Sequence, residues 1–440
     1  MFVSAILLML MALCIGARYG GAFFGMIGAL GLGALMLIFK TPPANPPINV
    51  MLIITSVVLA ASTLQASGGM DVLIKKAEKL LRKHPNQVVF ISPLIAYIFT
   101  FMAGTGNVLY NILPVVAEVA RKAGIRPERP ISISVIASQH AVPASPISAA
   151  TVAMVALLSP FDITITQILA LVIPASFIGI MAGAVSVCKY GKDLTKDDEY
   201  LKKLANGEIT DIDRSKENAL ADSKYAKMSV AIFLISAVLV VLLGTFSSLR
   251  PEVINAAGKV SRVGMTQMIE IVMMSSAALM VLLCKTDVSK VPNTPVFKAG
   301  MVGVVSVFGL AWMTDSFVAQ NIVMIKSMTK DIVTANPSYF GIALFIVSVF
   351  TNSQGATVAA LMPLGVTLGI DPILLAALYP AVCGYYVIPS NGVMLAGVAF
   401  DNTGTTKIGK YVVNHSYMLP GTVATVVSVV VSVILSKIFF

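Results

Sequence analysis

Two polar interruptions in apolar segments, one in each half of the chain, restrict its fold more than any other feature. Residues 103–114 read AGTGNVLYNILP, and residues 351–363 read TNSQGATVAALMP. The apolar runs beside them are roughly 15 residues long, whereas a helix that spans a bilayer needs about 20. Irregular backbone at membrane depth is tolerated only where protein buries it or where it lines a water-filled cavity. The pair therefore predicts two re-entrant hairpins, over residues 88–121 and 338–368.

The composition places the whole chain in a membrane. Hydrophobic residues make up 57% and charged residues 12% of its 440 residues, and the mean hydropathy is +0.88. A soluble domain carries about 25% charged residues. The basic residues behind the net charge of +10 lie in short loops between apolar spans, which is the positive-inside pattern and not a nucleic-acid-binding face. Four isolated cysteines without metal-ligand spacing leave no reason to expect a metal or a cofactor.

We expect an all-α polytopic membrane protein made of two halves, residues 1–188 and 228–440, joined by a cytoplasmic linker over 189–227. Each half contains five spanning helices, with its hairpin between the third and the fourth. A more polar helix precedes each hairpin, at 71–84 and at about 316–335. The predicted spans are 2–17, 20–39, 48–67, 131–158 and 164–188, followed in the second half by 228–246, 265–284, 298–314, 372–399 and 416–438.

The basic loops of the first half determine the orientation. Arg18, the basic residues of 75–83 and those of 121–129 fall on one side of the bilayer if the first hairpin enters and returns. The side rich in Lys and Arg is cytoplasmic, so the N-terminus is periplasmic. Because five is an odd number of spans, the second half begins on the opposite side, which makes the halves an inverted repeat. The C-terminus is then periplasmic as well.

A second pair of breaks lies in the long apolar helix that follows each hairpin. Residues 138–148 read SQHAVPASPIS, and residues 384–392 read GYYVIPSNG. Proline inside a helix removes a backbone hydrogen bond and clashes with the preceding turn, so helices 131–158 and 372–399 should unwind there. Two hairpin tips and two unwound helices in matching positions predict one binding site near the middle of the bilayer, which is typical of secondary transporters.

The polar residues at these breaks suit a small anion. The tips contain Gly, Thr, Asn, Ser and Gln but no acidic residue. The returning half-helix of each hairpin presents unpaired N–H groups and the positive end of its dipole, which bind carboxylates without a buried lysine. We therefore expect a dianion with one carboxylate at each hairpin. The candidate substrate-binding residues are Gly104, Thr105, Gly106, Asn107, Asn111, Ser138, Gln139, His140, Ser145, Ser148, Thr351, Asn352, Ser353, Gln354, Thr357, Ser390 and Asn391.

Five short blocks occur in a specific order and spacing along the chain, namely GTGN (104–107), ISISVIASQH (131–140), PASPIS (143–148), PSN (389–391) and GTT (404–406). Through these blocks the chain resembles, over its whole length, the anaerobic four-carbon dicarboxylate transporters of the Dcu type. The resemblance implies a bacterial inner-membrane antiporter that exchanges external fumarate, malate or aspartate for internal succinate during fumarate respiration.

The wider superfamily to which that family belongs adds further expectations. It implies a rigid scaffold and a mobile transport domain that moves in an elevator fashion, and a homodimer. Its paired tips read Ser-Asn-Thr, whereas the tips of this chain read Thr-Gly-Asn and Asn-Ser-Gln. Some relatives report substrate to a membrane sensor kinase, for which the stretch after Phe400 is the candidate contact.

Three other functional interpretations of the sequence remain, namely an ion-coupled symporter, an intramembrane enzyme and a channel. A sodium- or proton-coupled symporter of di- or tricarboxylates would use the same breaks, and sodium would need backbone carbonyls and hydroxyls alone. An intramembrane enzyme would need a nucleophile and a base. The sequence has no HExxH, no GxSxG and no pair of intramembrane aspartates, and its only histidines are His84, His140 and His415. A channel is the third alternative, but two hairpin tips suit a transporter with alternating access better than a continuous pore. His140 is either a proton site or substrate contact, or a hydrogen-bonded residue beside the unwound stretch.

Overall fold

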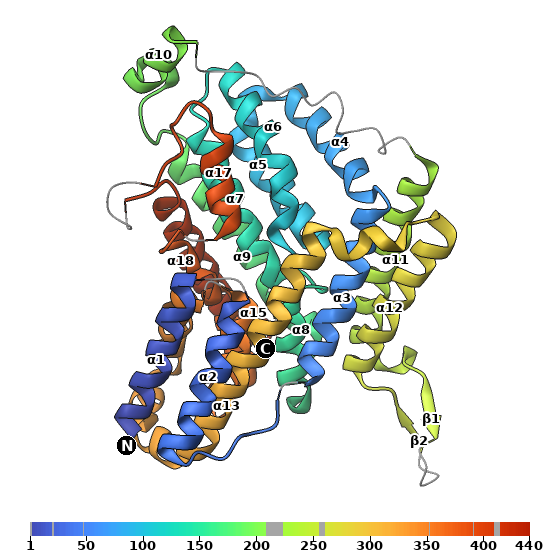
Figure 1. The fold of residues 1–440 in the computed structure, drawn as a ribbon, viewed down its shortest axis with the longest axis vertical. Helices are drawn as coiled ribbons and strands as arrows, with labels where there is room; N and C mark the ends of the chain where they lie inside the picture. Colours follow the sequence, from blue (N-terminus) through green and yellow to red (C-terminus); the bar gives the residue numbers. More distant parts are fainter. Residues whose placement is uncertain are drawn as a thin grey trace.

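Helices run through almost the whole of the computed structural model, which describes residues 2–19, 22–46, 48–207, 223–254, 260–351, 353–389, 391–408 and 414–440 (Figure 1). The first half contains α1 (Phe2–Tyr19), α2 (Phe23–Phe39), α3 (Ile48–Ala66), α4 (Gly69–Lys83), α5 (Val88–Ala103), α6 (Leu109–Lys122), α7 (Glu128–Ala144), α8 (Ala149–Leu158) and α9 (Ile165–Val187). The linker contains α10 (Asp198–Ala205). The second half contains α11 (Lys224–Thr245), α12 (Met265–Cys284), α13 (Pro295–Ala335), α14 (Phe340–Thr351), α15 (Gln354–Thr367), α16 (Pro372–Leu378), the 3-10 helix η8 (Tyr379–Tyr386), α17 (Gly392–Phe400) and α18 (Met418–Phe439).

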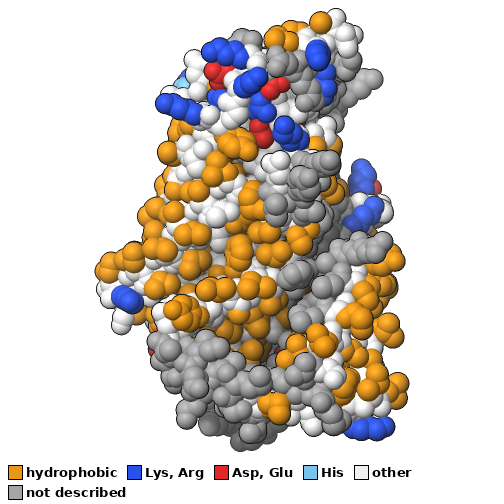
Figure 2. Space-filling model, turned by 90° about the vertical axis from the view of Figure 1, so that its left-hand side faces the viewer, with side chains coloured by type: hydrophobic (Ala, Val, Ile, Leu, Met, Phe, Trp, Pro, Cys, Tyr) orange, Lys and Arg blue, Asp and Glu red, His pale blue; other side chains and the backbone are white. Residues whose placement is uncertain are grey.

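The outer surface is that of a multi-pass membrane protein. Within the described residues, six helical stretches are long and apolar enough to cross a membrane, and α3 with α4 forms a further candidate that bends by 68°. One of the six is Pro85–Ala103, so the descending arm of the first hairpin is longer than the sequence suggested. Large apolar side chains point outward, such as Ile235 on α11 and Leu282 on α12, 68% and 74% exposed. Figure 2 shows hydrophobic side chains across the middle of the visible face and a gathering of charged ones at its upper end.

Both interrupted segments fold as helical hairpins, and both following helices are broken. The first hairpin consists of α5 and α6 and the second of α14 and α15. The helix after the first hairpin divides into α7 and α8, with residues 145–148 between them. The helix after the second divides into α16, η8 and α17. Helix α7 ends at Ala144, directly after Pro143. Helix α16 ends at Leu378, and Pro380 lies in the first turn of η8, so the second break begins earlier than the expected residues 384–392. Proline cannot donate a backbone hydrogen bond to an α-helix.

The two halves meet along α9 and α18, which pack against each other over much of their length. Small residues allow this close approach, since a Cβ added to Gly179 would lie 2.1 Å from Ser428 Oγ. Membrane helices associate through such small-residue contacts because lipid offers no hydrophobic driving force between them. Outside this pair, α2 packs against α13 and α12 packs against α3, and α3 also packs against α13 (Figure 1).

Two features depart from the expectation drawn from the sequence. A short antiparallel hairpin, β1 (Glu252–Ile254) with β2 (Val260–Arg262), follows α11, so the chain is not purely α-helical. The predicted span 298–314 and polar helix 316–335 form one continuous helix, α13. No proline follows Pro295 in this stretch, and Ser316 Oγ donates to Trp312 O at 2.6 Å, so this polar residue is satisfied within the helix.

Candidate functional site

The tip of the first hairpin approaches the broken helix α7–α8. Gly104 ends α5 in a left-handed conformation with φ of 67°, and a Cβ there would lie 2.8 Å from Ile147 O. Glycine is therefore required at this position for both its backbone angle and the space it leaves. Two side-chain bonds hold the tip in place: Thr100 Oγ1 lies 2.7 Å from Ser138 Oγ, and Ser145 Oγ donates to Phe101 O at 2.6 Å.

The tip of the second hairpin is connected to both broken helices through one side chain. Gln354, the first residue of α15, is buried, and its Nε2 donates to Gln139 O of α7 at 2.6 Å. The same nitrogen lies 3.1 Å from Cys383 Sγ in η8. Ser353 caps α15 by accepting from Ala356 N at 3.3 Å. Gln354 thus joins three of the four breaks.

These segments enclose a cavity of about 240 Å³. Its walls come from the two tips, the two broken helices and α3, and none of the described side chains that line it is charged. The lining residues are Ile54, Gly104, Thr105, Gly106, Val135, Ser138, Gln139, Val142, Ala149, Ala150, Ser353, Gln354, Gly355, Tyr385, Asn391 and Val393.

The N-termini of three helices lie at this cavity, opposite the tip of the first hairpin. Ala149 and Ala150 begin α8, and Gln354 and Gly355 begin α15. Asn391 caps α17 and accepts from Val393 N at 2.9 Å, while the residues before α6 form the opposite tip. Each N-terminus supplies unpaired N–H groups and a partial positive charge. The cavity can therefore bind a small anion without a lysine or arginine.

The predicted site residues divide into three sets. Those that line the cavity are Gly104, Thr105, Gly106, Ser138, Gln139, Ser353, Gln354 and Asn391. Those that lie outside its lining are His140, Ser145, Ser148, Thr351 and Thr357. The third set falls outside what the structure describes, namely Asn352, Ser390 and the side chains of Asn107 and Asn111.

The residues outside the lining support the breaks themselves. Ser148 caps α8 by accepting from Thr151 N at 3.1 Å, and Thr351 Oγ1 lies 2.7 Å from Thr357 Oγ1 in the second hairpin. His140 is buried against α18, where its Nε2 lies 3.1 Å from Thr425 Oγ1. The histidine therefore points away from the cavity and has a protein partner.

Sequence reasoning missed several lining residues. Tyr385 of η8 and Ile54 of α3 belong to the cavity wall, and so do Val135 and Val142 of α7. The two valines could have been found, because they lie one helical turn before and after Ser138 and Gln139. Nothing in the sequence near Ile54 marks it as different from other residues of an apolar span.

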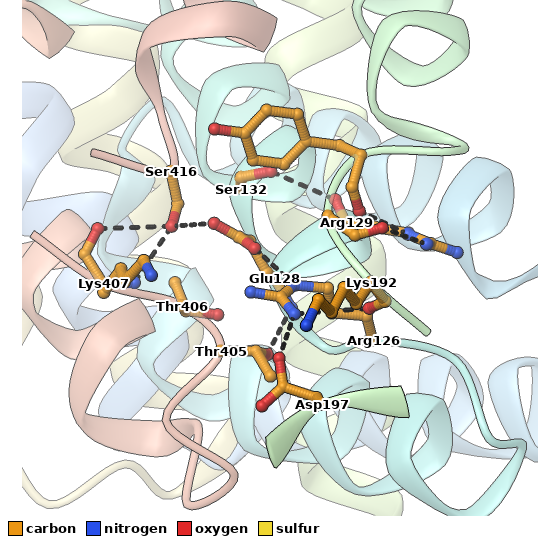
Figure 3. Close-up of polar contacts among 12 residues, drawn as sticks. Arg126, Glu128, Arg129, Ser132, Lys192, Asp197, Thr405, Thr406, Lys407 and Ser416 are labelled. Carbon is orange, nitrogen blue, oxygen red and sulfur yellow. Dashed lines mark hydrogen bonds and ion pairs between the residues drawn. The ribbon is translucent and has the colours of Figure 1, made fainter. Parts of the chain in front are cut away.

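A second polar cluster lies outside the cavity, at the N-terminus of α7 (Figure 3). Arg126 is buried and pairs at 2.5 Å with both Glu128 Oε2 and Asp197 Oδ2. Burial lowers the pKa of Arg126, but its bonds to Glu128 and Asp197 outweigh that effect, so the pKa is raised. Glu128 Oε1 also accepts from Ser416 Oγ at 2.5 Å, and Glu128 N donates to Thr405 Oγ1 at 3.2 Å. The cluster joins α7, the linker and the segment before α18.

No group of three or more His, Cys, Asp or Glu side chains that could hold a metal occurs among the described residues. Polar contacts in the cavity instead come from hydroxyls, amides and backbone groups. Such donors recognise carboxylates through hydrogen bonds.

A family model described as an anaerobic C4-dicarboxylate membrane transporter matches residues 1–440. The chain belongs to this family. The anaerobic C4-dicarboxylate transporter DcuB of Escherichia coli O6:H1 is 39% identical over 438 residues, which cover 98% of this chain and 97% of that protein. The C4-dicarboxylate transporter DcuA of Wolinella succinogenes is 38% identical, with 100% of both chains covered. DcuA of Escherichia coli K12 is 35% identical, with 98% of each covered.

Solved structures share the fold of this C4-dicarboxylate transporter family member. MtrF of Neisseria gonorrhoeae, placed in a class of antimetabolite efflux pumps, has a TM-score of 0.54 at 13% identity and covers 100% of this chain and 94% of its own. The YdaH transporter of Alcanivorax borkumensis has a TM-score of 0.54 at 14% identity, covering 95% and 96%. Relatives named as transporters support a role other than that of an enzyme.

Proposed function

We propose that the protein is an antiporter that exchanges C4-dicarboxylates, taking up fumarate, malate or aspartate and releasing succinate. The observation that supports this function best is that three helix N-termini and the tip of the first hairpin meet at one cavity whose described lining side chains are all neutral. The cavity, at about 240 Å³, is smaller than the pockets of roughly 300–1,000 Å³ that hold drug-sized ligands. A short dianion with one carboxylate at each hairpin tip suits both its size and its electrostatics.

Alternating access in this proposal rests on an inverted repeat of residues 1–188 and 228–440, with five spans and one hairpin in each half. The repeat is supported by helix contacts of the first half that have counterparts among the corresponding helices of the second half. Helix α2 packs on α13 as α12 packs on α3, and α5 packs on α7 as α14 packs on η8. The hairpins, the broken helices, α9 and α18 then form the mobile body of an elevator, while the remaining spans form its scaffold in a homodimer.

Exchange follows from the neutral lining of the cavity. An empty carrier would take unpaired N–H groups through apolar surroundings, and each such group costs roughly 1–3 kcal/mol. Bound carboxylates satisfy these groups, so the loaded carrier crosses faster than the empty one. Fumarate, malate and succinate are all dianions, so exchange of external fumarate or malate for internal succinate transfers no net charge, and its rate should not depend on the membrane potential.

The test of this function is uptake of labelled fumarate into proteoliposomes that contain the purified protein. We expect vesicles loaded with succinate to take up fumarate far faster than empty vesicles, with little response to an imposed potassium-diffusion potential. Vesicles without protein provide the control. Equal uptake into empty vesicles, or uptake driven by a sodium or proton gradient, would replace the antiporter with the ion-coupled symporter.

The same proposal places the protein in the bacterial inner membrane with both termini in the periplasm. The basic residues of 75–83 and 121–129 support this orientation, since cytoplasmic loops carry the excess of Lys and Arg. A membrane sensor kinase is the further proposed partner. Its contact would involve the segment after Phe400, where the buried Asp401 accepts from Thr405 Oγ1 at 2.8 Å.

A further inference from the structure

The side-chain amide of Gln139 is a polar group of the cavity that the protein leaves unsatisfied. Gln139 is 5% exposed, and neither its Nε2 nor its Oε1 has a hydrogen-bond partner among the described residues. Buried polar side chains are normally paired. Of the described residues that carry a buried, unpaired side-chain atom, Gln139 is the one that lines the cavity.

The position of Gln139 on α7 directs its side chain toward the cavity. Val135, Ser138, Gln139 and Val142 all line the cavity, and their spacing places them on one face of a helix. His140 lies about 100° further round the helix and contacts α18 instead. The main chain at Gln139 is held in place because its carbonyl accepts from Gln354 Nε2 at 2.6 Å.

Neighbouring polar groups of the cavity already have partners within the protein. Ser138 Oγ lies 2.7 Å from Thr100 Oγ1, Ser353 Oγ accepts from Ala356 N at 3.3 Å, and Asn391 Oδ1 accepts from Val393 N at 2.9 Å. The amide of Gln139 therefore differs from these side chains in that both its donor and its acceptor remain available to a ligand.

A carboxylate can satisfy only half of this amide. An ionised carboxylate accepts hydrogen bonds and donates none, whereas an amide presents a donor nitrogen and an acceptor oxygen. The Nε2 group can donate to a substrate carboxylate. The Oε1 atom needs a donor, which a hydroxyl or an ammonium group beside the carboxylate supplies. Rotating the amide by 180° exchanges the positions of Nε2 and Oε1, but the ligand must still supply one acceptor and one donor.

We infer, on the basis of the proposed dicarboxylate site, that Gln139 determines specificity for the substituent at C2 of the substrate. Its Oε1 accepts from a 2-hydroxyl or 2-ammonium group, so the site favours malate and aspartate over succinate and fumarate, which carry no donor at C2. Substrates without the donor leave a buried acceptor unpaired, and a site built in this way discriminates against them.

The test measures substrate preference instead of activity alone. Half-saturation concentrations for malate, aspartate, succinate and fumarate are determined for the unaltered protein and for Gln139→Met, which keeps the length of the side chain but removes both polar atoms. For the unaltered protein we expect the half-saturation concentration of succinate to be about 10-fold higher than that of malate, which corresponds to the free energy of one hydrogen bond. In Gln139→Met this ratio of half-saturation concentrations should be close to one. Loss of the Nε2 donor weakens every substrate alike, so it cancels in the ratio.

Two further variants separate the acceptor from general damage to the site. Gln139→Glu keeps an acceptor and should weaken all dicarboxylates while preserving the preference for malate over succinate. Ser132→Ala, on α7 but outside the cavity lining, removes a hydroxyl that donates to Arg129 O at 3.2 Å and should leave the ratio unchanged. Ligand-induced shifts in the unfolding temperature of the detergent-purified protein give the same ratios when a variant no longer transports.

The possible failures are distinguishable. A preference that stays the same in Gln139→Met, or a ratio near one in the unaltered protein, overturns the role of Gln139 while exchange itself continues. Absence of dicarboxylate exchange and of ligand-induced stabilisation in the unaltered protein overturns the proposed function instead.

Discussion

A single left-handed residue shapes the tip of the first hairpin. Gly104 combines φ of 67° with a backbone carbonyl 2.8 Å from where a Cβ would lie. Left-handed backbone costs a residue other than glycine roughly 1–2 kcal/mol, and the contact with Ile147 adds to that cost. A side chain at this position would therefore displace the tip or the backbone at Ile147.

We predict that Gly104→Ala abolishes dicarboxylate exchange and lowers the free energy of unfolding by more than the roughly 1–2 kcal/mol that left-handed backbone costs. The measurements are exchange in proteoliposomes and thermal unfolding in detergent. Gly33→Ala is the matched control, because a Cβ at Gly33 in α2 would have no heavy atom within 4 Å and alanine favours a helix. Normal exchange by Gly104→Ala would show that the tip tolerates a displaced backbone.

At the scale of elements, the charged cluster at the N-terminus of α7 connects the linker to α7 through buried ion pairs. Arg126 connects Glu128 on α7 with Asp197, which in turn caps α10 by accepting from Tyr200 N at 3.0 Å. Removing one partner from a buried ion pair leaves an uncompensated charge and costs about 3–5 kcal/mol. An exposed ion pair contributes about 0–1 kcal/mol.

Arg126→Ala should accordingly lower the free energy of unfolding by several times as much as Arg262→Ala. The control pair, Arg262 with Glu252, lies on the β-hairpin with side chains that are 42% and 57% exposed, against 8% and 2% for Arg126 and Glu128. Denaturation of the purified proteins measures both changes. Equal losses would mean that the cluster contributes no more than a surface ion pair.

At the scale of the whole molecule, the linker helix and the β-hairpin lie at opposite ends. Figure 1 shows α10 at one end, with the N-terminus and the β1–β2 hairpin toward the other. Cytoplasmic loops carry the excess of Lys and Arg, so we expect the distribution of basic loops to orient the chain in the bilayer.

Cysteine labelling tests this orientation with two positions of similar exposure, Val253 at 45% and Leu201 at 43%. In a chain whose native cysteines are replaced by serine, an impermeant maleimide should label Val253→Cys in intact cells. Leu201→Cys should react only after the cells are opened. The reverse pattern would invert the topology and move the linker to the periplasm.

The sequence by itself determined the elements that depend on short stretches of chain. Bilayer thickness limits helix length, proline ends regular helix, and glycine marks backbone that side chains disfavour. The two hairpins and the two broken helices could therefore be predicted from residues 103–114, 138–148, 351–363 and 384–392. The polar residues at the breaks predicted only that the substrate is a small dianion. The resemblance to the family added that it is a C4-dicarboxylate.

Tertiary structure alone decided which side chains share the cavity. Gln139 and His140 are neighbours in the sequence, yet one lines the cavity and the other contacts α18. Ile54 and Tyr385 join the same wall from distant parts of the chain, and Glu128 pairs with Ser416. Local sequence preferences extend over a few residues, whereas the direction of a side chain and its partner depend on how whole helices pack.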